Sequence, residues 1–85
     1  MENYDLRIKP SAVNELEDLQ AKDRSRIISK IQNLAEEPRP RGCEKLSGRD
    51  RYRLRQGDFR ILFEVDDNAQ AVTVVKIGHR RDVYR

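Results

Sequence analysis

Two short segments of alternating apolar and charged residues, joined by Gly57-Asp58, restrict the fold of this chain more than any other feature. In the first segment Tyr52 and Leu54 alternate with arginines, and in 59–66 the odd-numbered positions are apolar. Successive side chains of a strand point to opposite faces, so the two apolar rows must share one face. A two-residue turn satisfies this condition, and glycine at its first position suits a type II′ turn. The resulting register pairs apolar residues with each other, Leu54 with Ile61 and Tyr52 with Phe63.

The same register predicts a cluster of arginines on the other face of the hairpin. It places Arg55 opposite Arg60 and Arg53 opposite Leu62, with Arg51 on the same side. Like charges directly opposite each other destabilise a sheet, so an anionic partner is expected. Planar, permanently charged guanidinium groups match the geometry of phosphate, which favours a nucleic-acid ligand. A merely solvated charged strand face is the competing interpretation.

The rest of the chain predicts two helices and two further strands. Residues 4–9 alternate as a strand that ends at Pro10. Ser11 is expected to cap one helix and Asp23 a second, which ends before Pro38. Residues 71–77 form the last expected strand, after a polar turn. The second helix carries its apolar stripe at Ile27, Ile28, Ile31, Leu34 and Ala35.

This order of elements predicts an α+β fold. Three sequential strands with short turns should form an antiparallel meander, and a chain of 85 residues is long enough for a single domain, residues 1–85. We expect two N-terminal helices packed on one face of a mostly antiparallel four-stranded sheet, in the order β-α-α-β-β-β.

Positive charge is concentrated in the second half of the chain. Residues 1–38 hold six basic and eight acidic side chains, a net charge of −2, whereas residues 39–85 hold twelve and seven, a net charge of +5. Thirteen of the eighteen basic residues are arginine, which favours specific phosphate or carboxylate contacts.

Several classes of function are disfavoured by composition. One cysteine, Cys43, permits no internal disulfide and fits a reducing compartment, and without a neighbouring histidine it is expected to be an inert loop residue. One histidine and one cysteine cannot make a closed metal site, and no glycine-rich phosphate loop is present, so no cofactor is expected. No run of residues is apolar enough to span a membrane, and no signal peptide is evident, so a cytoplasmic location is predicted.

Two segments carry a resemblance to a known family. Residues 52–67 (YRLRQGDFRILFEVDD) and 78–84 (GHRRDVY) resemble the RelE-type toxins of the RelE/ParE superfamily, and 46–48 and 10–12 fit as well. The resemblance covers essentially the whole chain. It implies a bacterial or archaeal toxin paired with a RelB-like protein antitoxin. The RelE branch cleaves messenger RNA in the ribosomal decoding site, whereas the ParE branch keeps the fold and poisons DNA gyrase.

The resemblance also implies which residues form the site on the concave sheet face. Arg53 and Arg55 match the two basic residues of the strand, Arg60 the hairpin arginine, Arg80 the C-terminal arginine and Tyr84 the late tyrosine. The segment between Arg80 and Tyr84 is shorter here than in some members. Further basic residues expected to bind RNA are Lys45, Arg51 and Arg81.

Metal-free RNA cleavage requires such groups. The ribose 2′-hydroxyl attacks the adjacent phosphorus, charge builds on the phosphate oxygens, and the leaving 5′-oxygen takes a proton. We expect Arg60 and Arg80 to clamp the phosphate while Arg53 and Arg55 bind RNA and bias proton transfer. Removal of one preorganised donor typically costs on the order of a hundredfold to a thousandfold in rate.

Proton transfer has two candidates near neutral pH. His79 is a possible acid or base, and Tyr84 is expected to stack on a base or to orient the nucleophile. Each has a structural alternative, because His79 could be an exposed imidazole and Tyr84 could pack the terminus onto the sheet. Glu64 and Asp82 could pair with nearby arginines rather than act as bases.

Three functions therefore compete. The first is a ribosome-dependent endoribonuclease acting on mRNA, the second a gyrase inhibitor of the ParE kind, and the third a non-catalytic RNA-binding member of the fold. An acidic or amphipathic segment of an antitoxin could neutralise the basic face.

Overall fold

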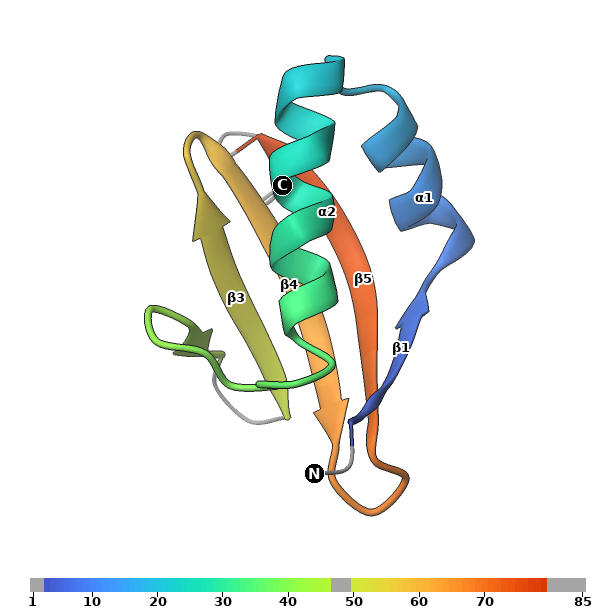
Figure 1. Cartoon of the computed structure of the whole chain (residues 1–85), viewed down its shortest axis with the longest axis vertical. Coiled ribbons are helices and arrows are strands. Elements are labelled where there is room, and N and C mark those ends of the chain that lie inside the picture. Colours follow the sequence, from blue (N-terminus) through green and yellow to red (C-terminus); the bar gives the residue numbers. More distant parts are fainter. Residues whose placement is uncertain (1–2, 47–49, 80–85) are drawn as a thin grey trace.

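The strands form one sheet, and the helices lie together on one side of it (Figure 1). The computed structural model describes residues 3–46 and 50–79. Within these ranges the elements are β1 (Asp5–Ile8), α1 (Pro10–Glu17), α2 (Ala21–Asn33), β2 (Glu44–Lys45), β3 (Arg51–Gln56), β4 (Phe59–Asp66) and β5 (Ala71–His79). The sheet order is β1-β5-β4-β3-β2, with β1 parallel to β5 and the other pairs antiparallel. The predicted α+β class is confirmed, with the two-residue β2 as a fifth strand.

The β3–β4 hairpin has the predicted register. Leu54 pairs with Ile61, and Tyr52 pairs with Phe63. Gly57 has a φ of 60°, while Asp58 keeps the negative φ usual for a non-glycine residue. A single positive φ at the first turn position is the type II′ geometry that the Gly-Asp pair predicted.

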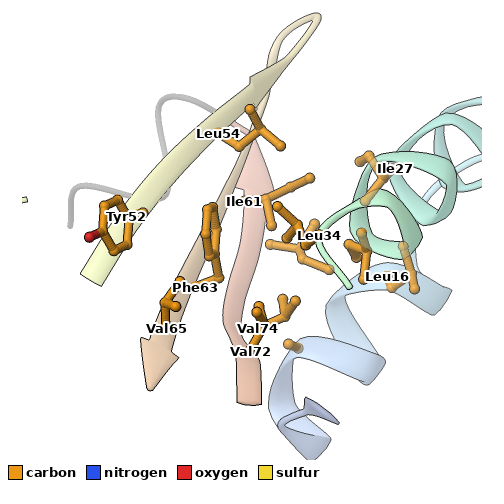
Figure 2. Packing of buried hydrophobic residues seen from close by; sticks show 13 residues of the cluster. Leu16, Ile27, Leu34, Tyr52, Leu54, Ile61, Phe63, Val65, Val72 and Val74 are labelled. Atoms are coloured by element: carbon orange, nitrogen blue, oxygen red, sulfur yellow. The ribbon is translucent and has the colours of Figure 1, made fainter. Parts of the chain in front are cut away.

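A continuous apolar core lies between the sheet and the helices (Figure 2). Phe63 and Ile61 are fully buried, and they share the core with Ile27 and Ile31 of α2 and with Leu34, the C-cap residue of that helix. The other buried members are Ala12, Leu16, Tyr52, Leu54, Val65, Val72, Val74 and Ile77. Ile28, which the sequence stripe included, is exposed, so the buried face of α2 is narrower than predicted.

Both predicted helix caps are wrong, the first by two residues and the second by three. α1 begins at Pro10 with Lys9 as its N-cap, rather than at Ser11. Proline suits the first helical position because its φ is fixed near the helical value and its missing N–H has no partner there anyway. α2 begins at Ala21 after Gln20, and Asp23 lies in the first turn, where a negative charge favours the helix dipole.

β5 is two residues longer than predicted and contains an irregularity. Its pairing with β4 passes from Val74–Phe63 to Lys76–Leu62, which leaves one extra residue in β5. β1 pairs with β5 only as far as Val74. Beyond that point Glu15 of α1 accepts hydrogen bonds from the Ile77 backbone N–H at 3.1 Å and from Lys76 Nζ at 3.0 Å. The carboxylate of Glu15 thus provides a hydrogen-bond acceptor for the backbone N–H of Ile77, at the part of β5 that β1 no longer covers.

A polar network ties the connection after α2 to the far end of the sheet. Arg39 donates two hydrogen bonds to Asp67, at 3.1 and 2.9 Å, and one to the Tyr52 hydroxyl at 2.8 Å. Tyr4 donates to the same Asp67 carboxylate at 2.7 Å. These hydrogen bonds, chiefly those from Arg39, lower the pKa of Asp67 below its usual value.

We predict that Asp67→Asn lowers the stability of the protein and changes its pH dependence. The folded-state pKa lies below the unfolded value of about 3.9, so the ionised carboxylate stabilises the fold above that pH. This stability is lost as the pH falls through the folded-state pKa. The free energies of unfolding of the wild-type protein and of Asp67→Asn, measured with denaturant, should therefore differ at pH 7 and converge as the pH falls below about 4. Asp58→Asn in the other turn is the control, and a pH-independent difference would contradict the assignment.

Candidate nucleic-acid interface

Four arginines of β3 and β4 lie on the surface of the sheet that faces away from the helices. Arg51, Arg53 and Arg55 alternate along β3 with the buried Tyr52 and Leu54, so they point away from the core. Arg60 of β4 lies between Phe59 and Ile61, whose side chains face the core. We call the surface that carries Arg51, Arg53, Arg55 and Arg60 the arginine face.

Arg55 and Arg60 are direct cross-strand partners on this face. A two-residue turn makes Gln56 and Phe59 the last hydrogen-bonded pair, so the next pair, Arg55 and Arg60, is of the non-hydrogen-bonded kind. In such pairs the Cα atoms are typically about 4.5 Å apart, and the side chains lie closer than elsewhere in the ladder. The neighbour of Arg60 on β5 is Gly78, which adds no side chain to the row. The side chains of Arg55 and Arg60 therefore lie side by side at one end of the sheet.

Carboxylates from neighbouring strands accompany the other two arginines. Glu64 accepts from Arg51 Nε at 3.2 Å and from its terminal nitrogen at 2.6 Å. Glu44 of β2 forms an ion pair with Arg53, its cross-strand partner. Arg55 instead donates to the backbone carbonyl of Gly57 at 3.2 Å. These two carboxylates therefore lie toward the Arg51 end of the arginine row.

Two residues predicted to belong to the site are not brought to the arginine face. Lys45 pairs with Tyr52, and directly opposite residues share a face, so Lys45 lies on the helix side of the sheet. His79 pairs with Phe59, and the two rings meet edge to face with centroids 5.9 Å apart. Since Phe59 packs against the core, His79 also lies on the helix side.

The C-terminal residues predicted for the site, Arg80, Arg81 and Tyr84, lie outside the described residues, as does Asp82. Glu44 was missed by the sequence prediction, whereas the pairing of Glu64 with an arginine was anticipated. Glu44 could have been found from the short extended segment that precedes β3. If that segment pairs with β3 as a strand, one of its residues must lie opposite Arg53, and this residue is Glu44.

Other kinds of site find little support in the part of the chain that the structure describes. No group of three His, Cys, Asp or Glu side chains there could hold a metal ion. Cys43 is half-buried, and burial raises the pKa of its thiol, which disfavours the reactive thiolate. A hollow of about 650 Å³ lies between α2, the loop that follows it and Leu54, on the helix side. Among 3–46 and 50–79, no helix is long and apolar enough to cross a bilayer.

Comparison with known proteins identifies the class. The family model described as the ParE toxin of the type II toxin-antitoxin system parDE matches residues 6–84. Toxin RelG of Mycobacterium tuberculosis is 35% identical over 34 residues, a match that spans about two-fifths of either protein, 40% of this chain and 39% of RelG.

Solved structures give the same class over nearly the whole chain. The RelE–RelB complex of Pyrococcus horikoshii has a TM-score of 0.81 at 26% identity, covering 94% of this chain and 98% of that one. Isolated E. coli RelE has a TM-score of 0.79 at 28% identity, covering 95% and 90%. The RelBE2 complex of M. tuberculosis, at 23% identity and a TM-score of 0.80, covers 92% and 99% and supports the fold alone.

The two-layer fold is therefore that of a type II toxin. This chain belongs to the RelE/ParE toxin family.

We predict that the repulsion between Arg55 and Arg60 lowers the free energy of unfolding. Arg55→Gln keeps the length of the side chain and a donor but removes one of two facing charges, so the free energy of unfolding should rise by up to about 1 kcal/mol at low salt. The gain should shrink as salt screens the repulsion. Arg41→Gln, an exposed loop residue that lines the same hollow as Glu36 and Glu37, is the control and should give no such gain. Destabilisation by Arg55→Gln would show that the two arginines do not repel.

Proposed function

We propose that this toxin is a ribosome-dependent endoribonuclease that cleaves messenger RNA in the decoding site and thereby stops translation. The observation that carries the proposal is the pairing of Arg55 with Arg60 on the sheet face that the helices leave open. A long polymer such as RNA can lie across an open face, whereas a small substrate usually occupies a pocket.

The proposed reaction is the attack of a ribose 2′-hydroxyl on the adjacent phosphorus, without a metal. The nucleophile loses its proton, the P–O5′ bond breaks, and the 5′-oxygen takes up a proton. Negative charge grows on the non-bridging oxygens, which two guanidinium groups stabilise better in the transition state than in the ground state. We assign this clamp to Arg60 and Arg80, and RNA binding to Arg53 and Arg55.

Of the two candidates for proton transfer, the proposal keeps Tyr84 and drops His79. His79 contacts Phe59 on the helix side, so its imidazole lies across the sheet from Arg55 and Arg60. We therefore give His79 no role in the reaction and keep Tyr84 as the group that stacks on a base or orients the nucleophile. Arg51 and Arg81 add to RNA binding, and Lys45 on the other face adds only to the general positive charge.

The proposed partners are an antitoxin protein and the ribosome. Two of the structural relatives named above are toxins in complex with RelB antitoxins. An acidic segment of such an antitoxin would neutralise the arginine face, which carries four arginines and two glutamates. The ribosome would hold the messenger in a cleavable shape, so the site of action is the cytoplasm.

A second candidate is inhibition of DNA gyrase without cleavage. It is favoured by the description of the matched family model as a ParE toxin. A third, RNA binding without catalysis, shares the arginine face. Induction in cells distinguishes all three, because the first gives messenger cleavage in translated frames within minutes, the second gives loss of supercoiling, and the third gives neither.

We predict that Arg60→Ala lowers the rate of messenger cleavage on programmed ribosomes by about a hundredfold to a thousandfold, because it removes a preorganised donor from the transition state. His79→Gln should retain activity within a few-fold, since His79 lies on the other face. The measurement is single-turnover cleavage followed by mapping of 5′ ends. Equal loss in both variants would contradict the assignment of faces, and unimpaired cleavage by Arg60→Ala would contradict the proposed clamp.

A further inference from the structure

Glu44 is paired with Arg53, the middle one of the three arginines on β3. It stands on the two-residue edge strand β2, directly opposite Arg53, and its carboxylate forms an ion pair with the guanidinium. The two side chains differ in exposure, since 66% of Glu44 is accessible but only 21% of Arg53. The mostly buried side chain of Arg53 is thus paired with the carboxylate of Glu44, which remains exposed to solvent.

Arg53 and its partner Glu44 lie next to the Arg55–Arg60 pair. The other cross-strand neighbour of Arg53 is the half-buried Leu62, and Arg55 lies two residues along the same face. Residues i and i+2 of a strand are about 7 Å apart, so Arg53 is the arginine of β3 next to the Arg55–Arg60 pair. A phosphate that reaches from Arg55 and Arg60 to Arg53 meets the carboxylate of Glu44.

A carboxylate and a phosphate oxygen use the same donors. Both accept charge-assisted hydrogen bonds from the guanidinium edge, so they compete for Arg53. The carboxylate also repels a nearby phosphate, and at a partly exposed site this repulsion is only partly screened. Glu64 plays no equivalent part, because its partner Arg51 is four residues away from Arg55 along the strand.

We propose that Glu44 is a built-in competitor of the RNA phosphate at Arg53. It keeps the guanidinium oriented while lowering the affinity of the toxin for free single-stranded RNA. A phosphate of the RNA binds Arg53 only when other phosphates of the same strand are already bound to the toxin, so that Glu44 is displaced. This requirement favours a messenger that is held in place over a free strand. This inference rests on the proposed function, because it takes RNA as the ligand of the arginine face.

The test is the affinity of the full chain for a short single-stranded 2′-O-methyl oligonucleotide, which lacks the attacking hydroxyl and stays intact. Glu44→Gln should bind it about threefold to tenfold more tightly at low salt, as expected for removal of one carboxylate from a partly exposed ion pair. The log–log slope of affinity against salt should steepen by about 0.7, the value for one added phosphate contact on a single strand. A purely structural role of Glu44 would leave this slope unchanged.

The matched control is Glu17→Gln, which makes the same change in net charge at an exposed position on α1, in the helix layer. It should change affinity by less than about twofold. In an Arg53→Gln background the effect of Glu44→Gln should fall to that of the control, because its partner is gone. Thermal unfolding of each variant shows whether it remains folded.

The outcomes separate this inference from the function on which it rests. Oligonucleotide binding that is insensitive to Arg55→Gln would overturn both. Binding that depends on Arg55 but is equal in Glu44→Gln and Glu17→Gln would overturn the competitor role alone. Tighter binding by Glu44→Gln with a steeper salt slope, abolished in the Arg53→Gln background, supports it.

Discussion

The pairing register of β3 with β4 is the constraint on which the structure depends. It places Tyr52 and Leu54 beside Phe63 and Ile61 in the core, and by the same alternation it holds the arginines together outside. A slip of one residue would turn one strand over relative to the other, exposing its apolar row and burying its charges. The hydrophobic effect thus fixes which face carries the arginines, and the two-residue turn at Gly57-Asp58 fixes the register that opposes Arg55 to Arg60.

This coupling explains how a small chain keeps charges that repel. Burial of Ile61, Phe63 and Leu54 is worth roughly 1.5–3 kcal/mol for each side chain, whereas facing like charges at a surface cost about 0.2–1 kcal/mol. Packing therefore dominates over electrostatics at this position. The protein also moderates the repulsion along β3, with Glu44 paired to Arg53 and Glu64 paired to Arg51.

The parts of the fold that sequence could predict are those fixed by periodicity. The β3–β4 register and turn, the class of the fold and most of the core follow from alternation and helical spacing. Helix starts were missed because Ser11 and Asp23 are good caps in isolation, whereas proline geometry and tertiary packing set the boundaries at Pro10 and Ala21. The irregularity near Val74 and Lys76 has no periodic signal, and it precedes the extension of β5 to His79. The face of Lys45 depends on its pairing in the two-residue β2, and that of His79 on the extension of β5 beyond Ile77, where the strand was expected to end.

The most direct test of the account is side-chain NMR of the arginine Nε–H groups during titration with a 2′-O-methyl RNA oligonucleotide. Each guanidinium reports its own contact with phosphate, so the binding face is observed without relying on activity. The account predicts that the signals of Arg55 and Arg60 shift together and first, while that of Arg26, exposed on α2 in the helix layer, stays in place. Shifts confined to arginines of the helix layer, with Arg55 and Arg60 unmoved, would contradict it.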